Sequence, residues 1–368
     1  MTKNKKILFI ASHPFGIAPS QRFRFEQYIS FLNKNGFECK QSSFLSKNDY
    51  RLFYLHGHFF RKFWIILKGT LIRLANVLEA RKYDIIFIQR EATLLGTAIF
   101  ETLFKKYSRA KLVFDFDDAI WVLDVSEQNK RFAWLKNPSK TSKIILYSDI
   151  VFAGNQYLFD FAKQYNKNVV MIPTTIDTEQ YHPNEKQRSS DFSQVCIGWI
   201  GSATTIAHFH QFTPIVKKIK DEFGDRITFK VIGDGLYRNE SLGIQSIKWS
   251  ADEERHQVNS FDIGIMPLPD DQWARGKCGL KGLLYMALEI PPVMSPVGVN
   301  QEIVQDGING FLAKTPEEWL HKLSLLIQSA KLREKMGKAA RQTVIERYSV
   351  HSQKQRYLEY LNGLITNK

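Results

Sequence analysis

Runs of consecutive apolar residues recur along the chain, and each is followed by a loop and then by a segment with helical spacing. In the first half the runs cover residues 7–11, 84–88, 111–116, 149–153 and 168–172. Continuous apolar runs indicate strands that are buried on both faces of a parallel sheet. Their alternation with helices predicts a doubly wound α/β domain, in which ligands lie at the carboxyl ends of the strands.

The same pattern restarts after a polar, irregular stretch that contains Pro173 and Pro183. Strands are expected at 195–200, 227–232 and 262–266, each ending in a turn of small residues or proline. The sequence therefore predicts two domains. The expected parts are 1–178, a linker at 179–193, a second domain at 194–345 and a final helix within 346–368.

The segment from Gly276 to Gly298 combines several features of a phosphate site. It begins as a glycine-containing loop with Lys277 and Lys281, continues as a short apolar helix that ends before Pro291, and finishes in a small strand and a glycine turn. A loop that opens into a helix offers free backbone N–H groups and the positive end of the helix dipole. The alternative is an ordinary loop and a buried helix.

The order of residues in this segment resembles the donor-binding region of glycosyl transferases group 1, in a bacterial branch of glycosyltransferase family 4 that builds surface polysaccharides. The resemblance rests on Gly276-Lys277-Cys278-Gly279-Leu280-Lys281-Gly282 and on the turn Ser295-Pro296-Val297-Gly298. It implies the α/β GT-B fold, with two Rossmann-like doubly wound domains and an interdomain cleft. It also implies transfer of a sugar from a nucleotide-sugar with retention of configuration, without metal or cofactor, and a final helix that crosses back to the first domain.

The resemblance places the donor mainly on the second domain. The implied donor-binding residues are Gly16, Gly201, Ser202, Gly233, Asp234, Pro267, Arg275, Lys277, Gly279, Lys281, Leu284 and Gly298. Lys277 would also stabilise the leaving diphosphate during catalysis. The alternative for Arg275, Lys277 and Lys281 is that they are surface charges.

This chain departs from the family at one recognition element. Many members carry a pair of glutamates eight positions apart, and these would fall on Gly276 and Leu284. Leucine accepts no hydrogen bond, so the ribose must be held by other groups. This departure keeps a second interpretation open, in which the chain is a catalytically weak, sugar- or nucleotide-binding partner of another transferase.

Three carboxylates follow the expected strand at 111–116, in the sequence Asp115-Phe116-Asp117-Asp118. Such a cluster requires cations, hydrogen bonds or a metal, and an Asp-x-Asp metal site is one alternative. The resemblance instead implies no metal and puts Asp117 where many members have a catalytic histidine. Asp117 could also be a helix cap or a partner of Arg22 or Arg90.

Four further residues are expected beside the acceptor. They are Arg22, Arg24, Arg90 and Asp118. For the first two, both near the start of a helix expected from Ser20 to Gly36, the alternative is a pair of solvated helix charges.

The charge of the chain is concentrated in its first half. Residues 1–190 hold 29 Lys and Arg against 17 Asp and Glu, whereas residues 191–368 hold 22 against 20. An anionic membrane surface, a phosphate-bearing acceptor or nucleic acid would each fit this excess. No nucleic-acid-binding motif accompanies the charge, so nucleic acid is the least favoured partner. A glycan or lipid-linked acceptor is expected instead.

A helix expected at 56–82 carries a stripe with spacings of three and four residues. The stripe consists of Phe60, Trp64, Leu67, Leu71, Leu74 and Leu78. Such a stripe is usually packed core, but basic neighbours such as Arg61 and Lys62 also fit a helix that lies on a membrane. Both alternatives stay open.

Three cysteines without metal-ligand spacing argue against a disulfide framework and fit a reducing cytoplasm. The first apolar run is too short for a signal peptide, so a cytoplasmic protein, either free or peripheral on the inner membrane, is expected.

Overall fold

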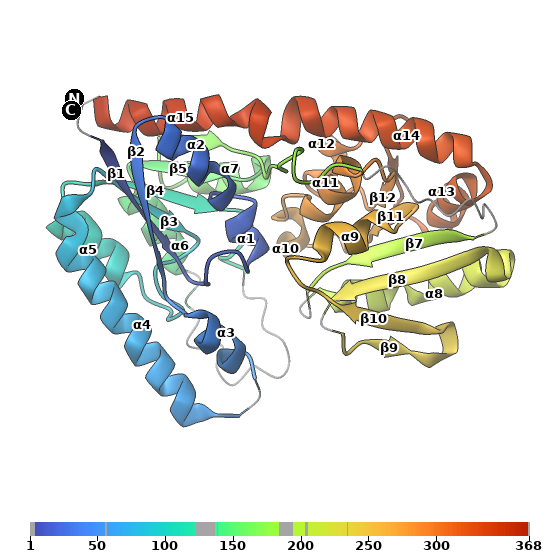
Figure 1. Cartoon of the computed structure of the whole chain (residues 1–368), viewed down its shortest axis with the longest axis horizontal. Helices are drawn as coiled ribbons and strands as arrows, with labels where there is room; N and C mark the ends of the chain where they lie inside the picture. The colour runs from blue at the N-terminus through green and yellow to red at the C-terminus, as the bar shows by residue number, and fades with distance from the viewer. Residues whose placement is uncertain are drawn as a thin grey trace. The chain divides into compact units, whose positions relative to one another are not determined.

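The chain is described by a computed structural model that covers residues 4–55, 57–122, 137, 139–183, 194–202, 205–233 and 235–366. It divides into two compact units (Figure 1). The first contains Met1–Thr174 and Gln353–Lys368, and the second contains Thr175–Ser352. The sequence placed the end of the first domain at residue 178. In the structure the division falls at Thr174, and most of the last helix is grouped with the first unit.

The first unit is built on a six-stranded sheet with the order β2-β1-β3-β4-β5-β6, in which every pairing is parallel. The strands are β1 (Lys5–Ala11), β2 (Phe37–Ser43), β3 (Ile85–Gln89), β4 (Lys111–Phe116), β5 (Ile150–Ala153) and β6 (Val169–Met171). β1, β3, β4 and β5 are almost wholly buried, in agreement with their apolar runs. β2 was not predicted, because it is an edge strand whose sequence is largely polar.

Helices connect these strands. They are α1 (Pro19–Arg22), α2 (Ile29–Lys34), α3 (Lys47–Phe53), α4 (Phe59–Glu79), α5 (Ile99–Tyr107), α6 (Ser139–Tyr147) and α7 (Gln156–Lys163). The prediction of a single helix between Ser20 and Gly36 is wrong. It is broken between α1 and α2, where Arg24 and Glu26 turn inward and form hydrogen bonds. α5 begins at Ile99, after a loop in which the backbone carbonyls of Thr93 and Leu95 accept hydrogen bonds from Lys140.

The second unit has a seven-stranded sheet with the order β13-β12-β11-β7-β8-β10-β9. Its strands are β7 (Val195–Ile200), β8 (Ile227–Gly233), β9 (Arg238–Asn239), β10 (Ile244–Lys248), β11 (Ile263–Met266), β12 (Pro292–Met294) and β13 (Phe311–Leu312). Only the β9–β10 pairing is antiparallel. β9 and β10 were not predicted, since β9 is an edge strand of only two residues and β10 alternates buried and exposed positions instead of forming a continuous apolar run.

The helices of this unit are α8 (Ile206–Phe223), α9 (Glu254–Asn259), α10 (Gln272–Arg275), α11 (Leu280–Ala287), α12 (Asn300–Ile303), α13 (Pro316–Gln328) and α14 (Ala330–Thr343). Thr315 and Glu318 form the capping box expected at the start of α13. A buried apolar cluster around Trp199, Phe209 and Ile263 joins α8 and the central strands.

α15 (Val350–Thr366) ends the described chain. Its Tyr357 is fully buried and stacks on Tyr28 with ring centroids 4.4 Å apart. Nearer its end, Asn362 accepts a 2.7 Å hydrogen bond from the Nζ of Lys5. These contacts attach residues 353–366 to the first unit.

Each sheet reverses its order at one place. In the first unit β1 lies between β2 and β3, so the chain changes direction at the β1–β3 pair. In the second unit the corresponding neighbours are β7 and β11. Ligands of doubly wound folds bind beyond the carboxyl ends of the strands at such switch points. The loops after β1 and β3, and those after β7 and β11, are therefore the candidate sites.

Candidate functional site

The loop after β1 is held by two buried side chains of the following helical turns. The backbone N–H of His13 donates a 2.9 Å hydrogen bond to Oε1 of Gln21, and Nε2 of Gln21 donates a 3.0 Å hydrogen bond to the carbonyl of His13. Glu26 accepts a 3.0 Å hydrogen bond from the N–H of Gly16, which has a φ of +79°. Burial raises the pKa of Glu26, although hydrogen bonds from Gln21 and Gly16 oppose the effect. The conformation of this predicted site loop is thus determined by Gln21 and Glu26.

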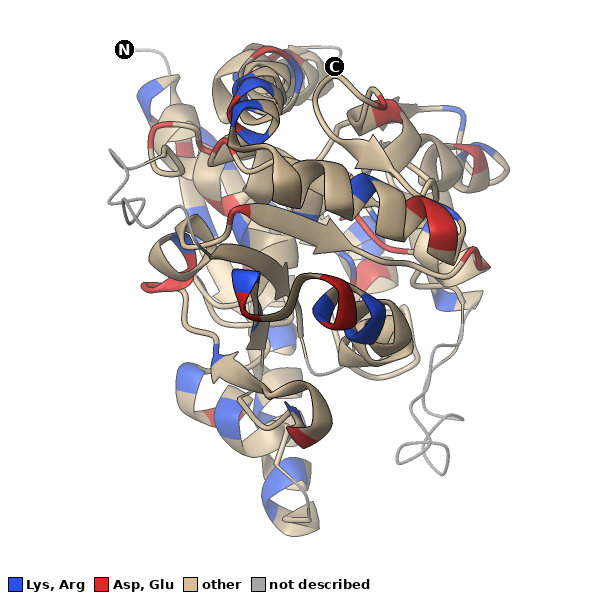
Figure 2. Cartoon of the chain, turned by 90° about the vertical axis from the view of Figure 1, so that its right-hand side faces the viewer, with Lys and Arg blue, Asp and Glu red and all other residues tan. Residues whose placement is uncertain are grey.

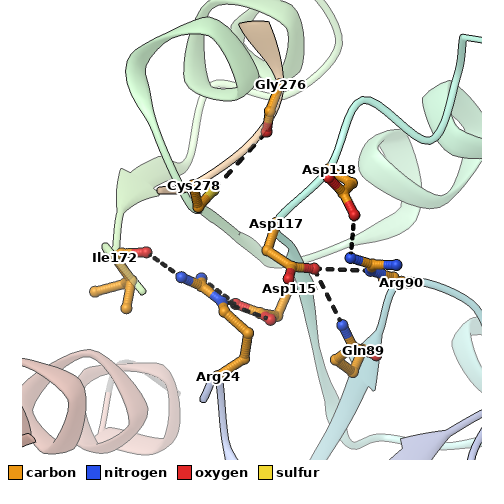
Figure 3. A network of polar contacts seen from close by, with 9 residues as sticks. All are labelled: Arg24, Gln89, Arg90, Asp115, Asp117, Asp118, Ile172, Gly276 and Cys278. Carbon is orange, nitrogen blue, oxygen red and sulfur yellow. Dashed lines mark hydrogen bonds and ion pairs between the residues drawn. The ribbon is translucent and has the colours of Figure 1, made fainter. Parts of the chain in front are cut away.

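Arg90 stands at the carboxyl end of β3 and pairs with two carboxylates that follow β4 (Figure 3). Its Nε lies 2.7 Å from Asp117, and its Nη2 contacts Asp118. Arg90 has a φ of +59°, which is strained for a residue other than glycine. Burial lowers the pKa of Arg90, but the two carboxylates outweigh burial and the pKa is raised. The partnership of Asp117 with Arg90, one of the alternatives from the sequence, is therefore present.

Arg24 and Asp115 form a buried pair beneath these residues, with both side chains fully inaccessible. The guanidinium reaches Asp115 through Nη2 at 2.5 Å and through Nε at 3.2 Å, while its Nη1 donates to the carbonyl of Ile172 at 2.6 Å (Figure 3). The alternative that Arg24 is a solvated helix charge is wrong, because its guanidinium is buried and bonds Asp115 and Ile172 inside the fold. A fully inaccessible side chain also does not support the expected place of Arg24 beside the acceptor. Arg22 is partly exposed and lies 4.9 Å from the ring of Phe23.

Two arginines thus form ion pairs with all three carboxylates that suggested an Asp-x-Asp metal site. Asp115 pairs with Arg24, and Asp117 and Asp118 pair with Arg90. Among the residues that the structure describes, no group of three or more His, Cys, Asp or Glu side chains is arranged to hold a metal.

His13, in the candidate loop after β1, was not singled out from the sequence. Its Nε2 lies 3.0 Å from the hydroxyl of Tyr54. Burial, assisted by the charge of Arg90, lowers the pKa of His13 to about 4, so the ring is neutral near pH 7. In the sequence, the feature that could have drawn attention to His13 is its position shortly after an apolar strand, where ligands of such folds bind. Its contact with Tyr54 could not be seen because the two residues are far apart in sequence.

Lys281 connects two of the predicted loops of the second unit. It lies in the first turn of α11, with Nζ 4.3 Å from the ring centroid of Trp199 and 3.4 Å from Oγ1 of Thr205. Thr205 in turn accepts a 3.1 Å hydrogen bond from the N–H of Ser202. The first N–H groups of α11 have no acceptor within the helix. A cation and the amino-terminal turn of α11 therefore lie near the turn after β7.

Glycines allow the backbone to come close at the ends of these strands. A Cβ on Gly201 would lie 2.3 Å from the ring of Trp199, and one on Gly233 would lie 3.2 Å from the carbonyl of Gly201. Gly279 caps α11 with a φ of +70°, and a Cβ at this position would lie 2.3 Å from the side chain of Ile303. Gly298, with a φ of +53°, would bring a Cβ to 2.7 Å from the carbonyl of Arg275. Larger residues would displace these loops.

The other predicted donor residues differ in their surroundings. Arg275 forms an ion pair with Asp270 at 2.7 Å, and Lys277 lies 5.1 Å from the ring of Trp273. Pro267 is buried directly after β11, and Leu284 is only 3% exposed within α11. Asp234 lies outside the described residues.

Comparison with known proteins adds a family to this geometry. Residues 194–329 match the model of the family described as glycosyl transferases group 1. This match identifies a group 1 glycosyltransferase domain in the second unit, and the predicted class of enzyme, a glycosyltransferase, is confirmed at the level of that domain. No curated protein sequence matches the chain.

Solved structures match nearly the whole chain. Sucrose-phosphate synthase from Thermosynechococcus elongatus aligns with a TM-score of 0.71 at 12% identity, over 99% of this chain and all of the other. A glycosyltransferase from Rickettsia africae aligns with a TM-score of 0.69 at 17% identity, over 100% of both chains. HepE of Anabaena, in complex with UDP and glucose, aligns with a TM-score of 0.64 at 16% identity, over 98% of this chain and 100% of its own. These likenesses confirm the predicted fold class, a GT-B fold with two Rossmann-like domains.

Proposed function

We propose that the chain is a retaining glycosyltransferase that moves a sugar from a nucleotide-sugar to a glycan or lipid-linked acceptor, without a metal or another cofactor. The nucleotide-sugar is a substrate. The process we propose is assembly of a cell-surface polysaccharide, on the cytoplasmic side and at the inner membrane leaflet. The excess of Lys and Arg over acidic residues in the first 190 positions supports an anionic acceptor or surface.

The observation that carries the proposal is the position of Lys281. Its ammonium group lies near the first amides of α11 and the glycine turn after β7, at the switch point of the second sheet. This set of donors suits a diphosphate, whose charge grows as the sugar–phosphate bond breaks. HepE, which has the same fold, was solved with UDP and glucose, and this supports a nucleotide-sugar as the donor.

The first unit would supply the acceptor side of the reaction. Asp117 is only partly exposed and is oriented by Arg90, so it can accept a hydrogen bond from a sugar hydroxyl in a defined direction. As a base it would remove the proton of the attacking hydroxyl, while Lys281 and the α11 amides stabilise the leaving diphosphate. Lys277, 5.1 Å from the ring of Trp273, is the second cation we assign to the diphosphate.

A second function remains open because of one observation. Leu284 is buried where many members carry the glutamate that holds the ribose, so it offers the nucleotide no hydrogen bond. A catalytically weak, sugar- or nucleotide-binding partner of another transferase would tolerate this change.

A melting experiment with a panel of nucleotides and nucleotide-sugars tests the proposal. A bound donor at about 100 times its dissociation constant adds roughly 2.7 kcal/mol to the free energy of unfolding. Nucleotide-sugars are expected to raise the melting temperature, and the purified protein is expected to hydrolyse or transfer the sugar. Binding without turnover would favour the partner function, and the absence of any shift would contradict both.

A further inference from the structure

Helix α4 packs on the first unit by its less apolar side. Its buried residues are Ile65, Gly69, Arg73 and Asn76. The six residues of the predicted stripe face outward instead, with Phe60 at 86%, Trp64 at 65% and Leu78 at 84% exposure. The core alternative for this stripe is therefore wrong.

Two contacts fix the rotation of α4 about its axis. A Cβ on Gly69 would lie 2.5 Å from the ring of Phe44, so the helix is pressed against the unit at this point. One turn later Arg73 is fully buried and donates to the carbonyls of Ala11 and Ala92, both at 2.6 Å. Turning the apolar stripe inward would break both hydrogen bonds and would leave a guanidinium without its buried acceptors. The outward direction of the stripe is thus determined by the fold.

The exposed face is large and strongly aromatic at one end. Four aromatic side chains within six residues, Phe59, Phe60, Phe63 and Trp64, are each more than 60% exposed. The preceding turn adds Tyr54 at 59% and Leu55 at 50%. Contiguous apolar surface of this kind marks a site of contact with a protein or a membrane.

The charge along α4 has one sign. Arg61 and Lys62 lie among the apolar residues, whereas Lys68 forms a 2.9 Å ion pair with Asp49 of α3. The only acidic residue of the helix is Glu79 at its far end, where it pairs with Lys40 and Lys82. Figure 2 shows the basic residues of α4 in its first turns, which form the lowest helix of that view. A second copy would place these cations against their own equivalents, which disfavours self-association through this face. An anionic lipid surface is complementary to it.

We propose that α4 is the membrane-binding surface of this protein, lying in the plane of an anionic bilayer with Phe59, Phe60, Phe63 and Trp64 in the headgroup region. Phe and Trp are the side chains typical of helices that lie in this interface, while lysine and arginine at the edge of the stripe attract anionic lipids. At about 1.5 Å per residue, the 21 residues of α4 extend over roughly 30 Å of membrane. Among the described helices none is long and apolar enough to cross a bilayer, so the contact is peripheral.

The inference deepens the proposed function, since it names the surface that brings the enzyme to a lipid-linked acceptor. The two can nevertheless fail separately. Vesicle binding is measured without any sugar donor, and donor binding is measured without vesicles.

The test is co-sedimentation of the full chain with phosphatidylcholine vesicles, with and without about 30% phosphatidylglycerol. The protein is expected to bind the anionic vesicles at least about tenfold more tightly than the neutral ones. The double variant Phe60→Ser/Trp64→Ser should lose at least about tenfold of that affinity. The charge variant Arg61→Gln/Lys62→Gln should flatten the dependence of binding on salt.

The matched control is Leu236→Ser, at a position in the second unit that is 80% exposed. It should bind vesicles like the unchanged chain. A second stripe variant, Leu71→Ser/Leu78→Ser, guards against a folding defect of the first, and all variants should melt within a few degrees of the unchanged chain.

Three results would overturn the proposal. The stripe variants could bind vesicles as tightly as the unchanged protein, or no vesicle binding could be seen at any lipid composition. The protein could also form dimers in sedimentation that the stripe variants abolish, without binding lipid, which would assign α4 to self-association instead.

Discussion

The Nζ atom of Lys281 lies 3.4 Å from the hydroxyl oxygen of Thr205, although 76 residues separate them in the chain. The contact joins the start of α11 to the start of α8, and the ring of Trp199 beneath Lys281 fixes the position of the ammonium group. The two helices thereby present their amino-terminal ends close to one cation. This relationship is the basis of the diphosphate site that we propose.

The buried pair of Arg24 and Asp115 should matter for stability more than for catalysis. Replacing Arg24 by Met leaves the Asp115 carboxylate buried without its cation, and we expect the free energy of unfolding to fall by about 3–5 kcal/mol. Denaturant unfolding measures this. The double variant Arg24→Met/Asp115→Leu should recover much of the loss, because no charge is then left buried. A loss below about 1 kcal/mol in the single variant would contradict the role given to the pair.

Asp117→Asn is expected to lower the rate of sugar transfer by about 10²–10⁴-fold, since an amide cannot remove a proton from the acceptor. The free energy of unfolding should fall by less than about 2 kcal/mol, because the ion pair with Arg90 is partly exposed to solvent. Initial rates and melting temperatures are measured on the same samples. Asp160→Asn, on the exposed side of α7, is the control. An unchanged transfer rate at an equal melting temperature would remove Asp117 from the mechanism.

The lowered pKa of His13 leads to a prediction of how the stability of the chain depends on pH. Its pKa is about 4 in the folded chain and near 6.5 when unfolded, so between these values the unfolded state binds more protons. Stability is therefore complete above pH 6.5 and falls as the pH is lowered towards 4, by at most about 1.4 kcal/mol per pH unit. Unfolding of the unchanged chain and of His13→Asn, compared at several pH values, isolates this contribution.

The difference in free energy of unfolding between the unchanged chain and His13→Asn should change most steeply with pH between 4 and 6.5. Below pH 4 the difference should no longer change with pH. His321→Asn, at an exposed position, should leave the slope of the unchanged chain intact. Parallel curves for the unchanged chain and His13→Asn across this window would show that His13 is not held neutral by burial.

The sequence predicted the central strands well, because a continuous apolar run such as Ile7–Ala11 has few other places in a folded chain. The edge strand β2 was missed because polar residues are tolerated at the margin of a sheet, and β10 was missed because its buried and exposed positions alternate beside the two-residue edge strand β9. The break between α1 and α2 was also missed, since hydrophobic spacing does not reveal that Arg24 has a buried acid as its partner.

The outward orientation of α4 shows a different limit. Periodicity identifies an apolar stripe but does not say which side of the helix meets the sheet. In this chain the deciding residues are Gly69 and Arg73 on the opposite side, and their roles depend on Phe44 and on carbonyls distant in sequence. Likewise, the conformation of the loop that contains His13 depends on hydrogen bonds with Gln21 and Glu26, and the burial of these two side chains cannot be predicted from the local sequence.

The affinity for a nucleoside diphosphate, measured by titration calorimetry on the unchanged chain and on Lys281→Met, tests the central claim most directly. The probe is the nucleoside diphosphate that raises the melting temperature most. The control is Lys217→Met, an exposed lysine of α8 that pairs with Asp221. Loss of a charge-assisted hydrogen bond to the diphosphate should weaken binding by about 10- to 100-fold in Lys281→Met, and hardly at all in Lys217→Met. Equal affinities for all three proteins, at equal melting temperatures, would contradict a diphosphate site at the start of α11.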